Sequence, residues 1–141
     1  MERYKRIFRE NIPKVSDRDI KDATKFIQDY TDTPTDILKD SIHKGKYETI
    51  KLYYLLQNSN VPYDNKRRPK ADSRINNTII LAHIRSSMGK DSSNYFWIVD
   101  GNQRVIQYEK LKKESINALI FEAPYIFISK NGKFIYDSDF K

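Results

Sequence analysis

Apolar residues recur along the chain at spacings that predict both helices and strands. Ile20 and Ile27 lie on one helical face, and Ser16 with Asp19 three positions later resembles a capping box at a helix start. This pattern predicts a helix over about residues 17–30.

A second, shorter helix is predicted soon afterwards. Thr33 and Pro34 are typical of a helix start, with threonine as the capping residue and proline at the first helical position. Leu38 and Ile42 form its apolar face, and Gly45 can end it. The N-terminal part of the chain, about residues 1–57, is therefore predicted to be mainly helical.

Residues 47–56 fit either a strand or a helix. Ile50 and Leu52 alternate with polar neighbours as in a strand, yet Ile50 and Tyr54 also lie four positions apart, as on one face of a helix. Periodicity leaves both alternatives open. The polar, proline-containing residues 57–74 are predicted to form a loop.

The second half of the chain alternates between strand and helix patterns. The predicted elements are strands over residues 78–84, 95–99 and 116–121, a helix over 103–113 with Val105, Tyr108 and Leu111 facing inward, and a hairpin within 124–137 that turns at Asn131-Gly132. Residues 78–121 would form the core. The whole pattern predicts one α+β domain.

Composition narrows the classes of protein to consider. The 141 residues are enough for one hydrophobic core, and the absence of cysteine excludes disulfides, thiolate catalysis and cysteine–zinc sites. His43 and His83 show no zinc-binding spacing, so no metal site is predicted, although His83 within its strand is a candidate base facing the functional site. Without a long apolar run or a secretory signal, we predict a cytoplasmic protein with no membrane partner.

The net charge of +7 suits a polyanionic partner. Basic residues concentrate in residues 1–14 and 64–74. Within the second cluster, the candidate contacts to nucleic acid are Lys66, Arg67, Arg68 and Lys70. Binding by such a cluster would be insensitive to base sequence. The alternatives are a solvated surface or docking onto an acidic protein.

Residues 100–104, with the sequence DGNQR, carry the clearest chemical signal. They follow a predicted strand and begin a predicted helix, so free N–H groups and the positive end of the helix dipole would meet an anion there. The Arg104 guanidinium matches phosphate oxygens, and Asp100 could cap the helix, orient Arg104 or hold a divalent ion through water. The alternative is a purely structural turn with Arg104 on the surface.

The stretch YFWIVDGNQRVIQYEKLKKESINALIF resembles the core of the ParB/sulfiredoxin superfamily, whose signature is strand, D-G-x-x-R, helix, strand. Upstream, LKDSIHKGKY is similar to a segment of the branch found in type IV restriction enzymes, whose own motif is DGQQR. The resemblance implies a small twisted mixed sheet with flanking helices. It also implies a nucleotide-phosphate site at the turn, formed by Gly101, Asn102, Gln103 and Arg104, with ATP or CTP and Mg²⁺ as the expected ligands.

The resemblance leaves three functions open, of which the third, after the two that follow, is a free-standing small-molecule kinase on the same fold. The first is a stand-alone ParB-like domain that acts in the DNA metabolism of a bacterium, plasmid or phage, with Asp100 and Arg104 as candidate catalytic residues for NTP hydrolysis or nuclease activity. The second is a non-catalytic module that keeps the fold and binds DNA or a protein, for example as an inhibitor. Sulfinic-acid reduction is excluded, because sulfiredoxin needs a cysteine within its motif and this chain has none.

Overall fold

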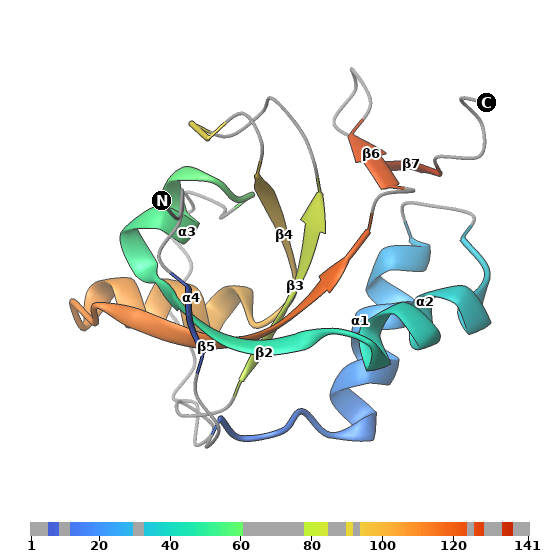
Figure 1. Cartoon of the computed structure of the whole chain (residues 1–141), viewed down its shortest axis with the longest axis horizontal. Helices are drawn as coiled ribbons and strands as arrows, with labels where there is room; N and C mark the ends of the chain where they lie inside the picture. Colours follow the sequence, from blue (N-terminus) through green and yellow to red (C-terminus); the bar gives the residue numbers. More distant parts are fainter. Residues whose placement is uncertain are drawn as a thin grey trace.

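The computed structural model describes residues 6–8, 12–29, 33–60, 78–84, 90–91, 94–123, 126–128 and 134–136 of the chain. Its strands are β1 (Arg6–Phe8), β2 (Lys46–Lys51), β3 (Ile79–Ile84), β4 (Tyr95–Asp100), β5 (Ser115–Glu122), β6 (Ile126–Ile128) and β7 (Phe134–Tyr136). Its helices are α1 (Asp17–Gln28), α2 (Thr35–His43), α3 (Leu52–Gln57) and α4 (Asn102–Lys110). Figure 1 shows their arrangement.

Five of the strands form one mixed sheet in the order β1-β2-β5-β3-β4. β3 and β5 run parallel, and every other neighbouring pair is antiparallel. β6 and β7 pair separately as an antiparallel hairpin, which confirms the two strands predicted on either side of Asn131-Gly132. The predicted α+β class, with a mixed sheet and flanking helices, is therefore confirmed.

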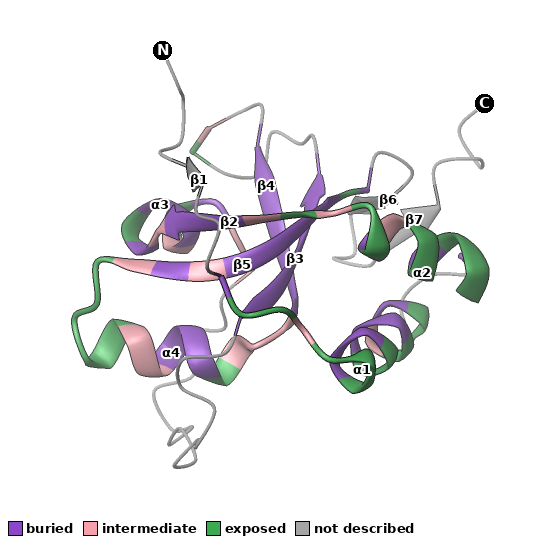
Figure 2. Cartoon of the chain, turned by 60° about the horizontal axis from the view of Figure 1, so that its bottom comes forward, coloured by how far each residue is buried: buried purple, intermediate pink, exposed green. Residues whose placement is uncertain are grey.

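Helices cover both faces of the sheet. α1 and α2 lie on one face, and α3 and α4 lie on the other (Figure 1). Along β3, Ile80 and Ala82 pack in the α1–α2 layer, whereas Ile79 and Leu81 pack in the α3–α4 layer. Because β3 and β4 are covered on both faces (Figure 2), their sequences are nearly continuous apolar runs.

The first helix begins as the sequence predicts. The Ser16 hydroxyl accepts a hydrogen bond from the Asp19 backbone N–H at 3.1 Å, and the Asp19 carboxylate accepts one from the Ser16 N–H at 3.3 Å. This reciprocal pair is a capping box. Ile20, Ala23 and Ile27 form the buried face of α1 against the sheet.

The second helix begins later than predicted. Its N-cap is Pro34, which has extended backbone angles (φ −59°, ψ 144°), so proline precedes the helix instead of being its first residue, and Thr33 does not cap it. Gly45 follows α2, as expected. A Cβ atom at Gly45 would lie 2.8 Å from the Leu119 Cδ1 atom and 3.0 Å from the Ile120 carbonyl oxygen, so glycine allows close approach to β5.

Both alternatives for residues 47–56 are realised, one after the other. β2 ends at Lys51, whose backbone is still extended (φ −66°, ψ 130°), and α3 begins at Leu52. Ile50 from the strand and Tyr54 from the helix pack in the same apolar cluster. The sequence therefore shows both strand and helix periodicity over these residues.

The N-terminal part is less helical than predicted, because it also supplies β1 and β2. β1 pairs with β2 at Arg6↔Ile50 and Phe8↔Glu48. The helix predicted over 103–113 is also shorter: α4 ends at Lys110, and Leu111 is 52% exposed, not inward-facing.

The outer edge of β4 is covered by the residues that follow α3. The Phe96 N–H donates to the Asn58 carbonyl oxygen at 2.7 Å, and the Ile98 N–H donates to the Asn60 side-chain oxygen at 2.9 Å. These bonds satisfy N–H groups that an uncovered edge strand would present to another chain.

Candidate functional site

The segment predicted to bind an anion forms the turn between β4 and α4. β4 ends at Asp100, and α4 begins at Asn102. Gly101 between them has left-handed backbone angles (φ 107°, ψ 19°) and is the N-cap of the helix. The first N–H groups of α4 and the positive end of its dipole are therefore directed at this turn.

Gly101 is required by packing as well as by its backbone angles. A Cβ atom there would lie 2.3 Å from the Ile79 Cγ2 atom, far inside the contact distance of two carbon atoms. The close approach that this glycine permits in the structure is thus between the turn and β3. A glycine is needed here with or without a ligand.

Arg104 is buried, not on the surface, with an exposed fraction of 4%. Its Nη1 atom donates a hydrogen bond to the Thr78 backbone oxygen at 3.1 Å and lies 3.5 Å from the position that a Cβ atom of Gly101 would take. A guanidinium stays charged at any physiological pH. A permanent positive charge is therefore held beside the N-terminus of α4.

The charge of Arg104 acts on Tyr108, one turn farther along α4. Burial raises the pKa of the Tyr108 hydroxyl, and the positive charge of Arg104, one helical turn away, acts in the opposite direction.

The remaining residues of the motif differ in their exposure. Gln103 is exposed, whereas Asn102 is half-buried and donates from its side-chain nitrogen to the Ile98 carbonyl oxygen at 3.3 Å. The Asn102 side-chain oxygen accepts no hydrogen bond within the described part of the chain. Asp100 does not cap α4, since Gly101 is the N-cap and no side chain caps it.

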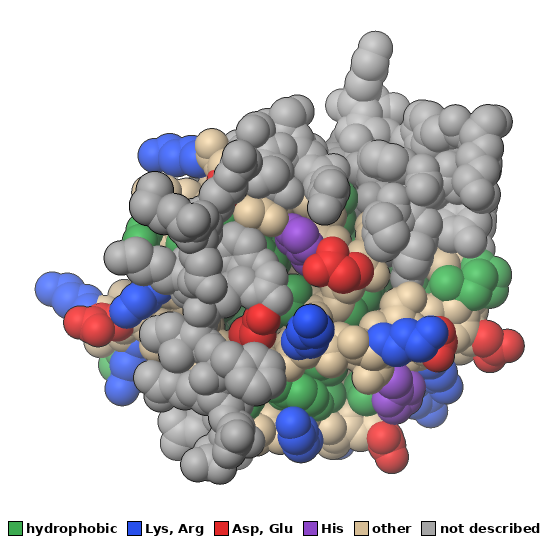
Figure 3. Space-filling view, viewed as in Figure 1, with side chains coloured by type: hydrophobic (Ala, Val, Ile, Leu, Met, Phe, Trp, Pro, Cys, Tyr) green, Lys and Arg blue, Asp and Glu red, His purple; other side chains and the backbone are tan. Residues whose placement is uncertain are grey.

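The structure therefore brings Asp100, Gly101, Asn102, Gln103 and Arg104 together at one turn. The basic residues predicted to contact nucleic acid, Lys66, Arg67, Arg68 and Lys70, lie outside the described residues. On the face shown in Figure 3, the described lysines and arginines are interspersed with acidic side chains. Within the described ranges, no three His, Asp or Glu side chains form a metal site, and no helix is long and apolar enough to cross a membrane.

His83 does not face this turn. Asp100 pairs with Ile80 near the start of β3, whereas His83 is level with Phe96 near the start of β4. Thr78 and His83 are five positions apart on extended chain, which corresponds to about 17 Å at the usual rise of a strand. The interpretation of His83 as a base at the DGNQR turn is therefore wrong, because the antiparallel pairing places the two at opposite ends of the sheet.

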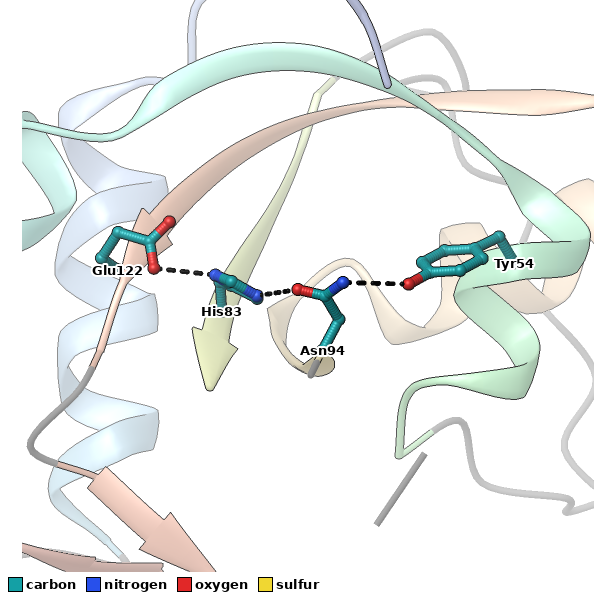
Figure 4. Close-up of polar contacts among 4 residues, drawn as sticks. All are labelled: Tyr54, His83, Asn94 and Glu122. Carbon is teal, nitrogen blue, oxygen red and sulfur yellow. Dashed lines mark hydrogen bonds and ion pairs between the residues drawn. The ribbon is translucent and has the colours of Figure 1, made fainter. Parts of the chain in front are cut away.

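His83 instead belongs to a polar cluster at the opposite end of β3 (Figure 4). Its Nδ1 atom lies 2.7 Å from the Glu122 carboxylate, and its Nε2 atom lies 2.5 Å from the Asn94 side-chain oxygen. Asn94 in turn contacts Tyr54 of α3. Sequence reasoning missed this cluster, although a lone histidine in the apolar strand IILAHI was a signal that it needed polar partners.

Comparison of the chain with models of known protein families, with curated proteins and with solved structures finds no match. The resemblance to the ParB/sulfiredoxin superfamily accordingly stays an interpretation of the sequence. Assignment of a function rests on the geometry of the chain itself.

Proposed function

We propose that this chain is a ParB-like, nucleotide-binding domain that holds a phosphate group at the β4–α4 turn. The observation that supports the proposal most directly is the position of Arg104, a buried cation beside the N-terminus of a helix that starts one residue after a strand. The helix dipole and the guanidinium contribute positive potential to the same place. An anion bound there would interact favourably with both.

Several residues of the turn would contact the phosphate group. Backbone N–H groups of Asn102 and Gln103 would donate to phosphate oxygens, and the exposed Gln103 side chain would add an amide. Arg104 would act chiefly through its charge, because its Nη1 atom is engaged with the Thr78 carbonyl oxygen. If the nucleotide is ATP or CTP with Mg²⁺, Asp100 is the motif's carboxylate for reaching the ion through water.

The test is a calorimetric titration of the protein with ATP, CTP and GTP, with and without Mg²⁺, at low salt. Gln103→Glu is the informative variant, since a carboxylate at the second position of α4 is favourable to the helix dipole but repels a phosphate. We expect this variant to be at least as stable as the wild type and to bind the preferred nucleotide about tenfold more weakly, or about 1.4 kcal/mol.

A matched control lowers the net charge by one at a position away from the turn. Lys39→Gln on α2 lowers the net charge by the same amount, but it changes an exposed residue on the opposite face of the sheet. This control should bind like the wild type. Equal nucleotide affinity in wild type and Gln103→Glu, or no nucleotide binding at all, would rule the proposal out.

A further inference from the structure

Two of the three large apolar side chains that are exposed in the described part of the chain lie at one end of the sheet. Tyr53 of α3 is 56% exposed, and Leu111, at the end of α4, is 52% exposed. They flank one backbone contact, in which the Leu52 N–H donates to the Glu114 carbonyl oxygen at 2.9 Å. A single exposed apolar residue is ordinary, but a group of them marks a surface that binds something.

A half-buried apolar residue links each of these two side chains to the core. Leu56 lies one turn after Tyr53 on α3, and Tyr108 lies one turn before Leu111 on α4. Leu56 and Tyr108 pack against the same core cluster, and the two helices contact each other on one face of the sheet (Figure 1). The four side chains therefore form one apolar area, the α3–α4 patch.

Charged residues that precede α3 and lie around the end of α4 border this patch. They are four lysines and two glutamates: Lys51, Lys110, Lys112, Lys113, Glu109 and Glu114. None of these six side chains forms an ion pair within the described ranges. Four positive and two negative charges leave a net charge of +2 around the patch.

Lys112 has a backbone conformation that is unusual for its residue type. Its φ is 55°, and no other non-glycine residue in the described part of the chain has a positive φ. The Lys112 N–H donates to the Glu109 carbonyl oxygen and the Lys113 N–H to the Tyr108 carbonyl oxygen, both at 3.0 Å. This arrangement is a Schellman motif, whose left-handed position is usually glycine. A lysine is less stable there than a glycine, which points to a function for its charge.

We propose that the α3–α4 patch binds an acidic segment of another protein. Apolar side chains of that segment would pack on Tyr53 and Leu111, and its carboxylates would face the lysines. Exposed apolar anchors within a charged rim are the usual arrangement of protein–protein interfaces. The excess of positive charge in the rim selects an acidic partner.

The mixture of charges around the patch favours a protein segment over a membrane or a nucleic acid. An anionic membrane or a phosphate backbone presents closely spaced negative charges, which would meet Glu109 and Glu114 as well as the lysines. A protein segment can place its carboxylates opposite the lysines alone. It also offers an apolar side chain to Leu111, which a phosphate backbone does not.

A library of random peptides displayed on phage is the probe for this surface. The library is first depleted on the double variant Tyr53→Ser/Leu111→Ser and then selected on the immobilised full chain. Both substituted side chains are exposed, so the variant should fold like the wild type. We expect the enriched peptides to combine aspartate or glutamate with leucine or an aromatic residue.

Fluorescence anisotropy then measures the affinity of one enriched, labelled peptide. Leu111→Ser should weaken binding about tenfold, because it removes an apolar anchor. Ile37→Ser is the matched control, since Ile37 is the third exposed apolar residue (39%) and lies on α2, on the opposite face of the sheet. Lys113→Gln should weaken binding at low salt more than at high salt, whereas Lys39→Gln on α2 should not.

Three results with the peptides would overturn the proposal: no peptide that distinguishes the wild type from the double variant, enriched peptides without acidic residues, or equal affinities in Leu111→Ser and Ile37→Ser. Vesicles containing phosphatidylserine and oligothymidylate are the competing ligands. If either binds the wild type more tightly than the peptide does and loses that binding in Leu111→Ser, the partner is a membrane or a nucleic acid and the proposal is wrong. No nucleotide is added in these measurements, so their outcome is independent of the proposed phosphate site.

Discussion

Arg104 donates a hydrogen bond to the backbone oxygen of Thr78, a residue 26 positions earlier in the chain. Thr78 immediately precedes β3, and its hydroxyl donates in turn to the Pro13 carbonyl oxygen ahead of α1. Arg104 is thus part of a junction between α4, β3 and the segment that leads into α1. Its charge favours an anion, and its hydrogen bond stabilises the fold.

Replacing Arg104 by alanine should therefore destabilise the protein. The change removes a buried charge-assisted hydrogen bond and leaves the Thr78 oxygen without that donor, so we expect the free energy of unfolding to fall by about 2–4 kcal/mol. Urea denaturation measures the change, and Arg18→Ala on the exposed face of α1 is the control. A loss no greater than that of Arg18→Ala would show that the buried guanidinium contributes little to stability.

Replacing Gly101 by alanine should be costly for two separable reasons. The left-handed backbone angles cost an alanine about 1–2 kcal/mol, and the clash of its Cβ atom with Ile79 adds about 1–3 kcal/mol. A double-mutant cycle with Ile79→Ala measures part of the clash, because this change removes the Cγ2 atom at 2.3 Å but keeps the Cβ atom at 2.8 Å. We expect Gly101→Ala to cost less in the Ile79→Ala background. Strict additivity would contradict the clash.

Stability should fall at alkaline pH through Tyr95. Burial raises the pKa of the Tyr95 hydroxyl above its ordinary value of 10.0, so the folded state binds the proton more tightly than the unfolded state. Its contribution is complete below pH 10 and is lost as the pH rises through the raised pKa of the folded state.

The variant Tyr95→Phe should accordingly show a shallower loss of thermal stability than the wild type above pH 10. Tyr53→Phe is the control, because Tyr53 is 56% exposed on α3. The same alkaline slope in Tyr95→Phe and the wild type would count against this explanation.

We expect nucleic-acid binding by the second basic cluster to be electrostatic. Simultaneous charge reversal of Lys66, Arg67, Arg68 and Lys70 should flatten the dependence of DNA affinity on salt, because fewer condensed counterions would be released. Fluorescence anisotropy at low and physiological salt measures this effect. No binding of DNA or RNA at about 50 mM salt would favour an acidic protein as the partner of this cluster.

Much of the fold was predictable because its central elements carry strong local signals. The apolar run of β3, the aromatic run of β4 and the capping box at Ser16 each define their element without reference to the rest of the chain. The change from strand to helix at Lys51 and Leu52 was not predictable, since the apolar residues on both sides fill one cluster. β1 was not predictable either, because it has only three residues and depends on pairing with β2, which is about 40 positions away in the sequence.

In the candidate sites, too, features that depend on adjacent residues were predictable and features that depend on distant residues were not. The turn at Gly101 and the helix after it follow from adjacent residues, so the sequence predicted them. The burial of Arg104 depends on Thr78, and the pairing of His83 with Glu122 depends on the parallel register of β3 and β5 across 39 positions. Both partners lie far away in the sequence. The sequence therefore left Arg104 as either a phosphate ligand or a surface residue, and it placed His83 at the wrong end of the sheet.

The central strand β3 is fastened at both of its ends. The Thr78 oxygen is held by Arg104 at one end, and the His83 ring is held by Asn94 and Glu122 at the other, while β4 and β5 pair along its length. A strand tied in this way cannot fray from its ends without breaking a side-chain bond first. In hydrogen–deuterium exchange, the amides of β3 should therefore be among the last to exchange, and should open only with the whole domain.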